Sequence, residues 1–548
     1  MMKKTLPIGI DSFREIRETN KYYIDKTMLI RDFIAAEDKV ALVTRPRRFG
    51  KTLNMTMLRE FFDITKDSKA IFDGLEIMDT EYASQINTRP VIFFTFKDCK
   101  ANSIESLIFK IGTVILTEYD KYYMLLRESF SESIIKSKAC LYRFFHIYDK
   151  LLTSSIDTDF LEIAIITLEQ AVFEYYKIKP ILLIDEYDQP IVSSFMNGYH
   201  DRMGDFFAGF YGAALKGQDC LHQALLTGIQ RIAKESIFSQ LNNIKVYTVI
   251  EKRYSKYFGL TTDEAMELLS NYGMDFDEAV KLKYDGYLFG NIEIYNPWSL
   301  LYYAETGELK NYWINTSTNY LVRKSIAEAD DMFRESFEGL VRDGIVEVAA
   351  NMECSFIELS SRYTLWGLLI NSGYLTVVEQ IDELFVRVRI PNGEVRSEFI
   401  IIFADQSNMR SEGLHEMFRH LFERNMDAFM KTYSGLVVSC TSYFDARENA
   451  YHMLFLGMCI SLSNLYRIKS NIESGVGRSD IIMESLSAGR PHIVIEFKQG
   501  EAVDALKEEA LRQILDNQYY SSLHGEILCI GIAHDKKKCS IAHKTLMN

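Results

Sequence analysis

A glycine, a lysine and a threonine stand together at the point where an apolar stretch gives way to a helical pattern. Gly50, Lys51 and Thr52 follow the apolar run 40–44 and match the end of the pattern GxxxxGK[ST], with Arg45 at the first glycine position. In this pattern the N–H groups of a helix N-terminus bind phosphates, the lysine reaches the β- and γ-phosphates, and the threonine binds Mg²⁺. The spacing predicts a site for ATP and Mg²⁺. The alternative is a basic strand-to-helix turn, and Arg45 departs from the general pattern because the first glycine often adopts an unusual backbone conformation.

A pair of acids supports the first interpretation. The stretch PILLIDEYDQP is an apolar strand pattern that ends in Asp185 and Glu186. We expect Asp185 to hold Mg²⁺ through water and Glu186 to orient or deprotonate the attacking water. Arg231 and Lys234 follow the next apolar run, at the sheet edge where ligands bind in open α/β sheets. They are candidates to sense the γ-phosphate, and a solvated start of a basic helix is the alternative.

Two carboxylates and a lysine lie in strand-like runs near the end of the chain. The runs flank SAGRP, which is typical of a hairpin turn. If the turn centres on Ala488, then Asp480 and Glu496 are cross-strand partners, with Cβ atoms roughly 4.5–5.5 Å apart. Two such acids repel each other unless a cation lies between them, and Lys498 shares the face of Glu496 because side chains alternate along a strand. The set predicts a Mg²⁺ site that activates water; the alternative is an inert ion-paired cluster.

Two flanking helical patterns offer further candidates for this second site. Glu448 shares a helix face with His452, four residues later, and is a candidate metal ligand. Gln513 lies in the amphipathic pattern ALKEEALRQILDNQYY and is a candidate to face the same site. Taken alone, each is more often ordinary helix polarity than a ligand.

The elements that must position these residues indicate an α/β protein. Apolar runs alternate with helical patterns in the first half, which favours a parallel sheet with crossover helices, and the stretch 100–178 predicts a helical insertion. From 260 to 360 the pattern is mostly helical. A helix and a hairpin with a Pro-Asn-Gly turn then predict either a winged-helix-like module or a hairpin that covers a helical core. The predicted strands are 40–44, 91–96, 181–184, 224–229 and 246–250, and the predicted domains are 1–260, 261–400 and a compact α/β unit at 401–548.

Composition excludes several classes of protein. The chain has 548 residues, of which 47% are hydrophobic and 25% charged, as in ordinary globular proteins, and its length predicts about three domains. A net charge of −14 argues against non-specific coating of nucleic acid. The 8 cysteines are scattered without a CxxC pair, and the most apolar run, 453–462, is far shorter than the ~20 residues of a membrane span. With no signal-peptide pattern, we expect a cytoplasmic protein without a membrane partner.

These motifs together resemble a bacterial family. YYIDKTMLI, RPRRFGKT, LLIDEYDQP, TGIQRIAKESIFSQLNN and YDGYLFG with YNPWSL are similar to the AAA-ATPase-like domain family, a group of P-loop NTPases. The segment with Asp480 and EFK resembles the PD-(D/E)XK nuclease superfamily domain that is commonly fused behind it. The resemblance implies a nuclease set and a nucleotide site. The nuclease set is Glu448, Asp480, Glu496, Lys498 and Gln513; the nucleotide site is Arg45, Pro46, Arg47, Arg48, Phe49, Gly50, Lys51 and Thr52 with Asp185, Glu186 and Arg231.

Two hypotheses of different classes follow. The first is an ATP-regulated, Mg²⁺-dependent nuclease that acts on DNA, in defence or in control of mobile elements. The second is a regulatory NTPase of the STAND type, whose nuclease-fold domain only binds nucleic acid or a partner. The intact acids and lysine of the second site favour the first hypothesis, and no further helicase motif supports a motor. A homo-oligomer is left open.

Overall fold

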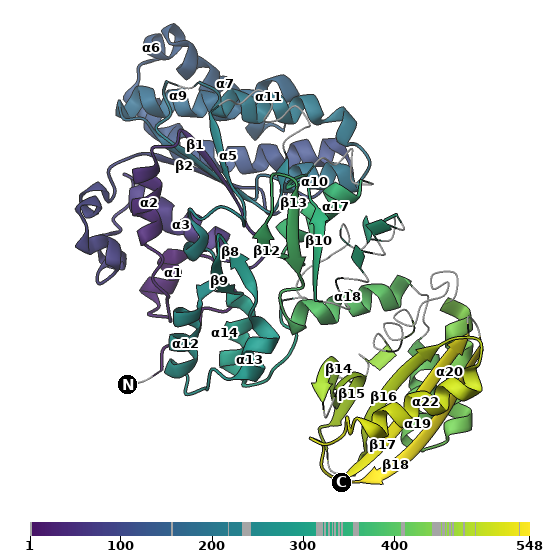
Figure 1. Ribbon diagram of the computed structural model, residues 1–548. Helices are drawn as coiled ribbons and strands as arrows, with labels where there is room; N and C mark the ends of the chain where they lie inside the picture. Colours follow the sequence, from purple (N-terminus) through teal and green to yellow (C-terminus); the bar gives the residue numbers. More distant parts are fainter. Residues whose placement is uncertain are drawn as a thin grey trace. The chain divides into compact units, whose positions relative to one another are not determined.

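The computed structural model resolves into two compact units (Figure 1). The first consists of the chain up to Phe333 with Ile345–Glu394, and the second of Arg334–Gly344 with Val395–Asn548. Most of the predicted middle region therefore belongs to the first unit. The structure describes residues 3–154, 157–217, 219–232, 243–313, 322, 325–326, 329–330, 332–333, 336–337, 340, 344–354, 361–406, 411–440, 451, 455, 458–459, 462, 465–474, 477–487, 489–535 and 538–548.

The first unit is built on a parallel sheet of five strands. The order is β2-β3-β4-β1-β6, and every neighbouring pair is parallel. β1, β3 and β4 are buried along their whole length, as expected for a sheet covered on both faces. Because the strands are parallel, the ends of β1, β3 and β4 meet at one edge, and the predicted α/β class is confirmed. The strands are β1 (Val40–Thr44), β2 (Val91–Thr95), β3 (Ile181–Asp185), β4 (Ala224–Gly228) and β6 (Ile244–Tyr247).

Helices enclose this sheet. The predicted insertion is a set of helices between β2 and β3, and residues of α5, α7, α9 and α11 share one hydrophobic core with the sheet (Figure 1). The helices are α1 (Phe13–Glu18), α2 (Met28–Ala36), α3 (Lys51–Phe62), α4 (Lys69–Phe72), α5 (Ile104–Ser129), α6 (Glu132–Ser137), α7 (Ala139–Leu152), α8 (Thr158–Glu162), α9 (Ala164–Tyr176), α10 (Gln189–Met196) and α11 (Gly204–Leu215).

The part that follows contains the predicted helices, α12, α13 and α14, together with short strands. Strands β7, β9 and β8 form a small antiparallel sheet, and β5 pairs with β11. Three of these strands, β5, β7 and β11, have only two residues each, too few for an alternating apolar pattern. The elements are β5 (Arg231–Ile232), β7 (Leu260–Thr261), α12 (Thr262–Asn271), α13 (Glu278–Tyr284), β8 (Tyr287–Phe289), β9 (Ile292–Tyr295), α14 (Pro297–Thr306), β10 (Ile345–Ala349) and β11 (Glu353–Cys354).

The predicted helix and hairpin are present, but the hairpin turn was wrongly placed. α17 (Arg362–Asn371) precedes β12 (Thr376–Gln380) and β13 (Phe385–Arg389), and β10 extends this hairpin to a sheet of order β10-β13-β12. Asp382 forms the turn by accepting the N–H groups of Leu384 and Phe385. The Pro-Asn-Gly triplet at 391–393 instead leads into helix α18 (Gly393–Gln406). Proline and glycine mark helix ends as well as turns, so the triplet alone did not distinguish them.

The second unit carries a mixed sheet of order β14-β15-β16-β17-β18, in which only the pair β16–β17 is parallel. Helix α22 connects these two strands and packs on one face, while α19 and α20 contribute to the core on the other face (Figure 1). Within the described part of the chain, no helix is long and apolar enough to span a membrane. The elements are α19 (Ser411–Phe422), α20 (Met426–Cys440), β14 (Tyr466–Ser474), β15 (Gly477–Ser485), β16 (His492–Gln499), α22 (Val503–Asp516), β17 (Glu526–Asp535) and β18 (Lys538–Met547).

A buried histidine is expected to make the second unit sensitive to acid. The His534 ring stacks on Tyr451 with 3.9 Å between ring centres, and its Nε2 lies 2.9 Å from the Tyr433 hydroxyl. Burial lowers the pKa of His534 from 6.5 to about 3. The unfolded chain therefore binds a proton more readily, so stability is lost as the pH falls below 6.5, by about 3 kcal/mol near pH 4. We expect His534→Phe to flatten the pH dependence of the unfolding free energy, whereas His543→Phe at an exposed position does not. Equal slopes would contradict this assignment.

Candidate functional site

The loop after β1 has the backbone of an anion-binding turn. Arg48 and Gly50 have φ values of 69° and 81°, in the left-handed region that favours glycine, and α3 begins directly afterwards at Lys51. The first N–H groups of a helix have no partner within the helix. Among the described residues, no side chain caps this helix at Gly50. These N–H groups are therefore placed to bind phosphate oxygens.

The end of β3 lies beside the start of α3. The Thr52 hydroxyl donates to Asp185 Oδ2 at 2.7 Å, and the Thr227 hydroxyl, from the end of β4, donates to Asp185 Oδ1 at 2.6 Å. Lys51 Nζ donates to the carbonyl oxygens of Arg45 and Pro46 at 3.0 and 2.9 Å, so the lysine spans the loop. The structure thus brings together the threonine and the aspartate that were predicted to share Mg²⁺.

The charged groups at this edge are desolvated. Burial lowers the pKa of the Lys51 ammonium group, and the nearby carboxylates of Glu186 and Asp185 oppose that shift. Burial also raises the pKa of Glu186, with Lys51 opposing. Glu186 has a φ of 52°, a strained conformation for a residue with a side chain. A carboxylate with a raised pKa beside a buried lysine is suited to accept a proton from water.

The side chain of Arg45, at the first glycine position of the motif, makes buried structural contacts. Its side chain is fully buried between the rings of Phe258 and Phe289, with 5.4 Å to each ring centre. The guanidinium donates to the carbonyl oxygens of Tyr247 and Thr248 at 2.9 and 2.6 Å. Burial lowers its pKa to about 9. The Arg45 side chain therefore fastens the start of the loop to the residues at and after the end of β6.

The other loop residues contact segments far along the chain. Phe49 is buried against the rings of Tyr287 and Phe289, at 5.0 and 5.2 Å between ring centres. Pro46 lies so close to Gly373 that a Cβ on this glycine would stand 2.8 Å from the Pro46 Cβ. Sequence reasoning missed these contacts, although YDGYLFG was among the motifs that carried the family resemblance.

Two tryptophans complete the surroundings of the loop. The Arg48 guanidinium lies 4.0 Å from the ring centre of Trp298, within cation–π distance. Trp313 Nε1 donates to the Arg47 carbonyl oxygen at 3.0 Å. The loop is thus enclosed by aromatic side chains from α14 and the segment after it.

The residues after β4 are held by an acid that sequence reasoning passed over. Asp188 is buried, which raises its pKa, and its Oδ2 accepts the N–H groups of Ile229 and Gln230 at 2.8 and 2.9 Å. Asp188 belongs to the same LLIDEYDQP motif as Asp185, which was the available signal. Arg231 lies in β5, and in the register of the two parallel strands it stands opposite Glu353 of β11. Lys234 lies outside the described residues, so a role of this segment in sensing the γ-phosphate stays a prediction.

The predicted hairpin register of the second unit is confirmed. β15 pairs with β16 through Ile481↔Ile495 and the pairs that follow toward the turn, and continuing by one residue places Asp480 opposite Glu496. The Asp480 N–H donates to Glu496 Oε2 at 3.3 Å, and the Phe497 N–H donates to Asp480 Oδ2 at 2.8 Å. The two carboxylates therefore lie at the end of the paired strands.

A lysine and a glutamine converge on the same carboxylate. Lys498 Nζ lies 3.7 Å from Glu496 Oε1, and Gln513 Nε2 from α22 donates to that oxygen. Gln513 Nε2 also lies 3.2 Å from the Tyr519 hydroxyl, to which Asn517 donates at 2.9 Å. Four of the five residues predicted for this site are thus brought together.

The donor set fits a divalent cation. Glu496 is 3% exposed, and burial raises the pKa of Asp480, so both carboxylates gain from a compensating cation. Glu448 lies outside the described residues, and among the residues that the structure does describe, no group of three or more His, Cys, Asp or Glu side chains is placed to hold a metal ion. Mg²⁺ usually keeps several waters and needs only one or two carboxylates. Asp480 and Glu496 are therefore the side chains that would hold it.

A glycine allows α22 to reach this site. Gly531 of β17 pairs with Glu496, and a Cβ on it would stand 2.4 Å from the Lys507 carbonyl oxygen and 2.5 Å from the Leu511 nitrogen. We expect Gly531→Ala to push α22 from the sheet and to lower the unfolding free energy by roughly 1–3 kcal/mol. Gly435→Ala, on α20 where a Cβ meets nothing within 4 Å, is the matched control. Equal unfolding free energies of the two variants would refute this role.

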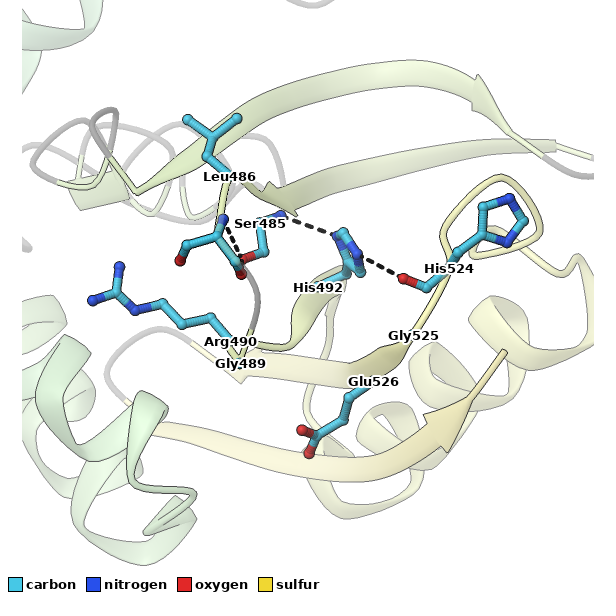
Figure 2. A pocket seen from close by; sticks show the side chains of 9 residues that line it. Ser485, Leu486, Gly489, Arg490, His492, His524, Gly525 and Glu526 are labelled. Atoms are coloured by element: carbon cyan, nitrogen blue, oxygen red, sulfur yellow. Dashed lines mark hydrogen bonds between the residues drawn. The ribbon is translucent and has the colours of Figure 1, made fainter.

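A cavity of about 390 Å³ lies elsewhere on the second unit, at the turn between β15 and β16. His492 accepts the Ser485 N–H at 3.0 Å through Nδ1, and its Nε2 lies 3.1 Å from the His524 carbonyl oxygen. Figure 2 shows that the side chains of Arg490 and His524 point away from each other. This cavity is at the turn end of the strands, and the carboxylate pair is at the other end, so the cavity is no part of the predicted site.

Comparisons with known proteins agree with the two units. Residues 7–238 match the family model described as a predicted AAA-ATPase, and residues 446–544 match that of the PD-(D/E)XK nuclease superfamily. A protein of Azotobacter chroococcum mcd 1, named "Uncharacterized protein in vnfD 5'region", is 26% identical over 404 residues. The alignment covers 72% of this chain and 69% of that protein.

Proposed function

We propose that this chain, an AAA-ATPase-like domain followed by a PD-(D/E)XK nuclease superfamily domain, is an ATP-regulated, Mg²⁺-dependent nuclease that cleaves DNA. Binding and hydrolysis of ATP at the loop 45–52 would control cleavage at Asp480 and Glu496. Defence or control of mobile elements is the role that we assign to such an activity. The protein would act in the cytoplasm, and a homo-oligomer is compatible with this proposal.

One observation carries the nuclease part. Asp480 and Glu496 are opposed at the end of two paired strands, with Lys498 beside Glu496. A chain that uses this fold only for binding has no need of two desolvated acids and a lysine at one point. A divalent cation held here would activate water and neutralise charge on the scissile phosphate. Lys498 would add positive charge where negative charge develops.

The nucleotide part rests on the first unit. The loop leads into the N-terminus of α3, whose first N–H groups have no partner within the helix, Lys51 spans the loop, and Thr52 with Asp185 would hold Mg²⁺. Glu186 would take the proton of the attacking water. Each of these residues comes from the end of β1, the start of α3 or the end of β3, so the nucleotide would lie at the carboxyl edge of the sheet.

The test is cleavage of plasmid, linear duplex and single-stranded DNA by the purified full-length protein, with ATP and Mg²⁺ omitted in turn. We expect cleavage to need Mg²⁺ and to change with ATP. ATP hydrolysis without cleavage of any of these DNAs would refute the nuclease and leave the regulatory NTPase as the better account.

The role of Glu186 in ATP hydrolysis can be tested separately from ATP binding. Glu186→Gln keeps the size of the side chain and removes the base, so ATP turnover is expected to fall on the order of 10²-fold or more. ATP affinity should stay close to that of the wild type, because the role proposed for Glu186 is toward the attacking water and not toward the phosphates. Calorimetry and a phosphate-release assay measure the two quantities. Turnover at the wild-type rate would show that Glu186 has another role.

A further inference from the structure

One residue at the start of helix α18 is buried in the first unit. Glu394 is the last residue of the first unit, and helix α18, which begins at Gly393, continues into the second. The Glu394 carboxylate is buried, with 2% of the residue exposed. Its Oε2 accepts the Ser299 hydroxyl at 2.8 Å, and its Oε1 accepts the Trp313 backbone N–H at 2.7 Å. The start of α18 is thus fixed to the first unit by hydrogen bonds to a carboxylate.

The same tryptophan also contacts the phosphate loop. Its indole Nε1 donates to the Arg47 carbonyl oxygen at 3.0 Å, while its ring is buried and packs near Tyr287 and Tyr374. One buried residue therefore joins the backbone of the loop on one side to the first turn of α18 on the other.

A second connection between the phosphate loop and Glu394 runs through residues of the motif YNPWSL. Asn296 caps helix α14 by accepting the Ser299 N–H, and Trp298 lies under the Arg48 guanidinium. Ser299, one residue later, donates to Glu394. Two neighbouring residues of the loop, Arg47 and Arg48, are thus linked to the same carboxylate by two short routes.

We propose that Trp313 and Glu394 are positioning residues that couple the phosphate loop to the first turn of helix α18, so that ATP at the loop alters the hydrogen bonds that hold the start of this helix. This inference rests on the proposed nucleotide site and is independent of cleavage. If phosphate binding moves the Arg47 carbonyl oxygen, the length of its hydrogen bond from Trp313 changes. The hydrogen bonds of Glu394 at the start of α18 would then change as well. Coupling of this kind requires a change at both ends of the contact, which hydrogen exchange can measure.

The experiment follows hydrogen exchange of peptides from 393–406 in the full-length protein, with and without ATP and Mg²⁺, while calorimetry measures ATP affinity in parallel. Trp313→Phe keeps an aromatic ring and the backbone bond to Glu394 but removes the indole donor to the loop. Trp366→Phe, another buried tryptophan, which packs on Phe333, is the matched control. We expect ATP to change exchange of these peptides in the wild type and in Trp366→Phe, and the change to be lost in Trp313→Phe although ATP still binds.

Glu394→Gln is the second variant, because it preserves shape but replaces one of the two acceptor oxygens by an NH2 donor, and it should reduce the ATP response in the same way. An unchanged response in Trp313→Phe, or no response in a wild type that binds ATP, would overturn the coupling. If calorimetry shows that the wild type binds no ATP, the proposed nucleotide site fails first, and the coupling is refuted with it.

Discussion

Mg²⁺-dependent DNA cleavage is expected to fall roughly 10³-fold or more in Asp480→Asn, because a bound metal contributes several kcal/mol to the transition state. The amide removes the charge that a divalent cation needs and still offers an oxygen to the Phe497 N–H, which donates to Asp480 at 2.8 Å. Asparagine is therefore the sharper substitution, since Asp480→Ala would also leave that N–H without its acceptor. Rates of plasmid nicking measure the effect.

Stability provides an independent readout of the same residue. Burial raises the pKa of Asp480, so its charged form is disfavoured in the folded protein, and neutralising it should not lower the melting temperature in metal-free buffer. Metal at 100 times its Kd should stabilise the wild type by about 2.7 kcal/mol, and Asp480→Asn much less. Asp504→Asn, at an exposed acid on α22, is the control. Cleavage that survives in Asp480→Asn would contradict the nuclease assignment.

The second large effect is expected in Lys51→Ala. Lys51 is 6% exposed, and its ammonium group donates to the carbonyl oxygens of Arg45 and Pro46. When ATP binds, Lys51 would donate to a charged phosphate in place of these neutral acceptors. Hydrogen bonds to charged groups contribute about 1.5–3 kcal/mol, and the loss corresponds to a decrease in ATP affinity of roughly 10- to 150-fold. Calorimetry with ATP and Mg²⁺ measures this change.

A matched lysine separates this effect from a general change of charge. Lys69→Ala, at an exposed position of α4, should bind ATP as the wild type does. The circular dichroism spectrum of Lys51→Ala should remain that of the folded protein, because the sheet and α3 persist without the side chain. If Lys51→Ala bound ATP as tightly as the wild type does, the assignment of the nucleotide site to this loop would be wrong.

Local sequence patterns predicted the strands of the parallel sheet and the hairpin that carries Asp480 and Glu496. Apolar runs of about five residues marked the buried strands because a parallel sheet covered on both faces leaves no polar face. The register of Asp480 and Glu496 followed from the turn, because a two-stranded hairpin has one free parameter, the position of its centre. These two features depend only on residues close together in the sequence.

Contacts between distant segments could not be predicted in this way. The burial of Arg45 between Phe258 and Phe289, and the bond from Trp313 to the loop, join residues more than 200 positions apart. Nothing in local periodicity specifies such pairs. The Pro-Asn-Gly triplet shows the related problem that one local signal serves both a turn and a helix start.

The most direct test of the central claim is the rate of plasmid cleavage in Mg²⁺ for the wild type and for Lys51→Ala, each with and without ATP. The account predicts that ATP, at a concentration that saturates the wild type but lies below the Kd of Lys51→Ala, changes the wild-type rate and leaves the rate of Lys51→Ala unchanged. Asp480→Asn should cleave roughly 10³-fold or more slowly than the wild type in either condition. A wild-type rate that is the same with and without saturating ATP would contradict regulation of the nuclease by the nucleotide.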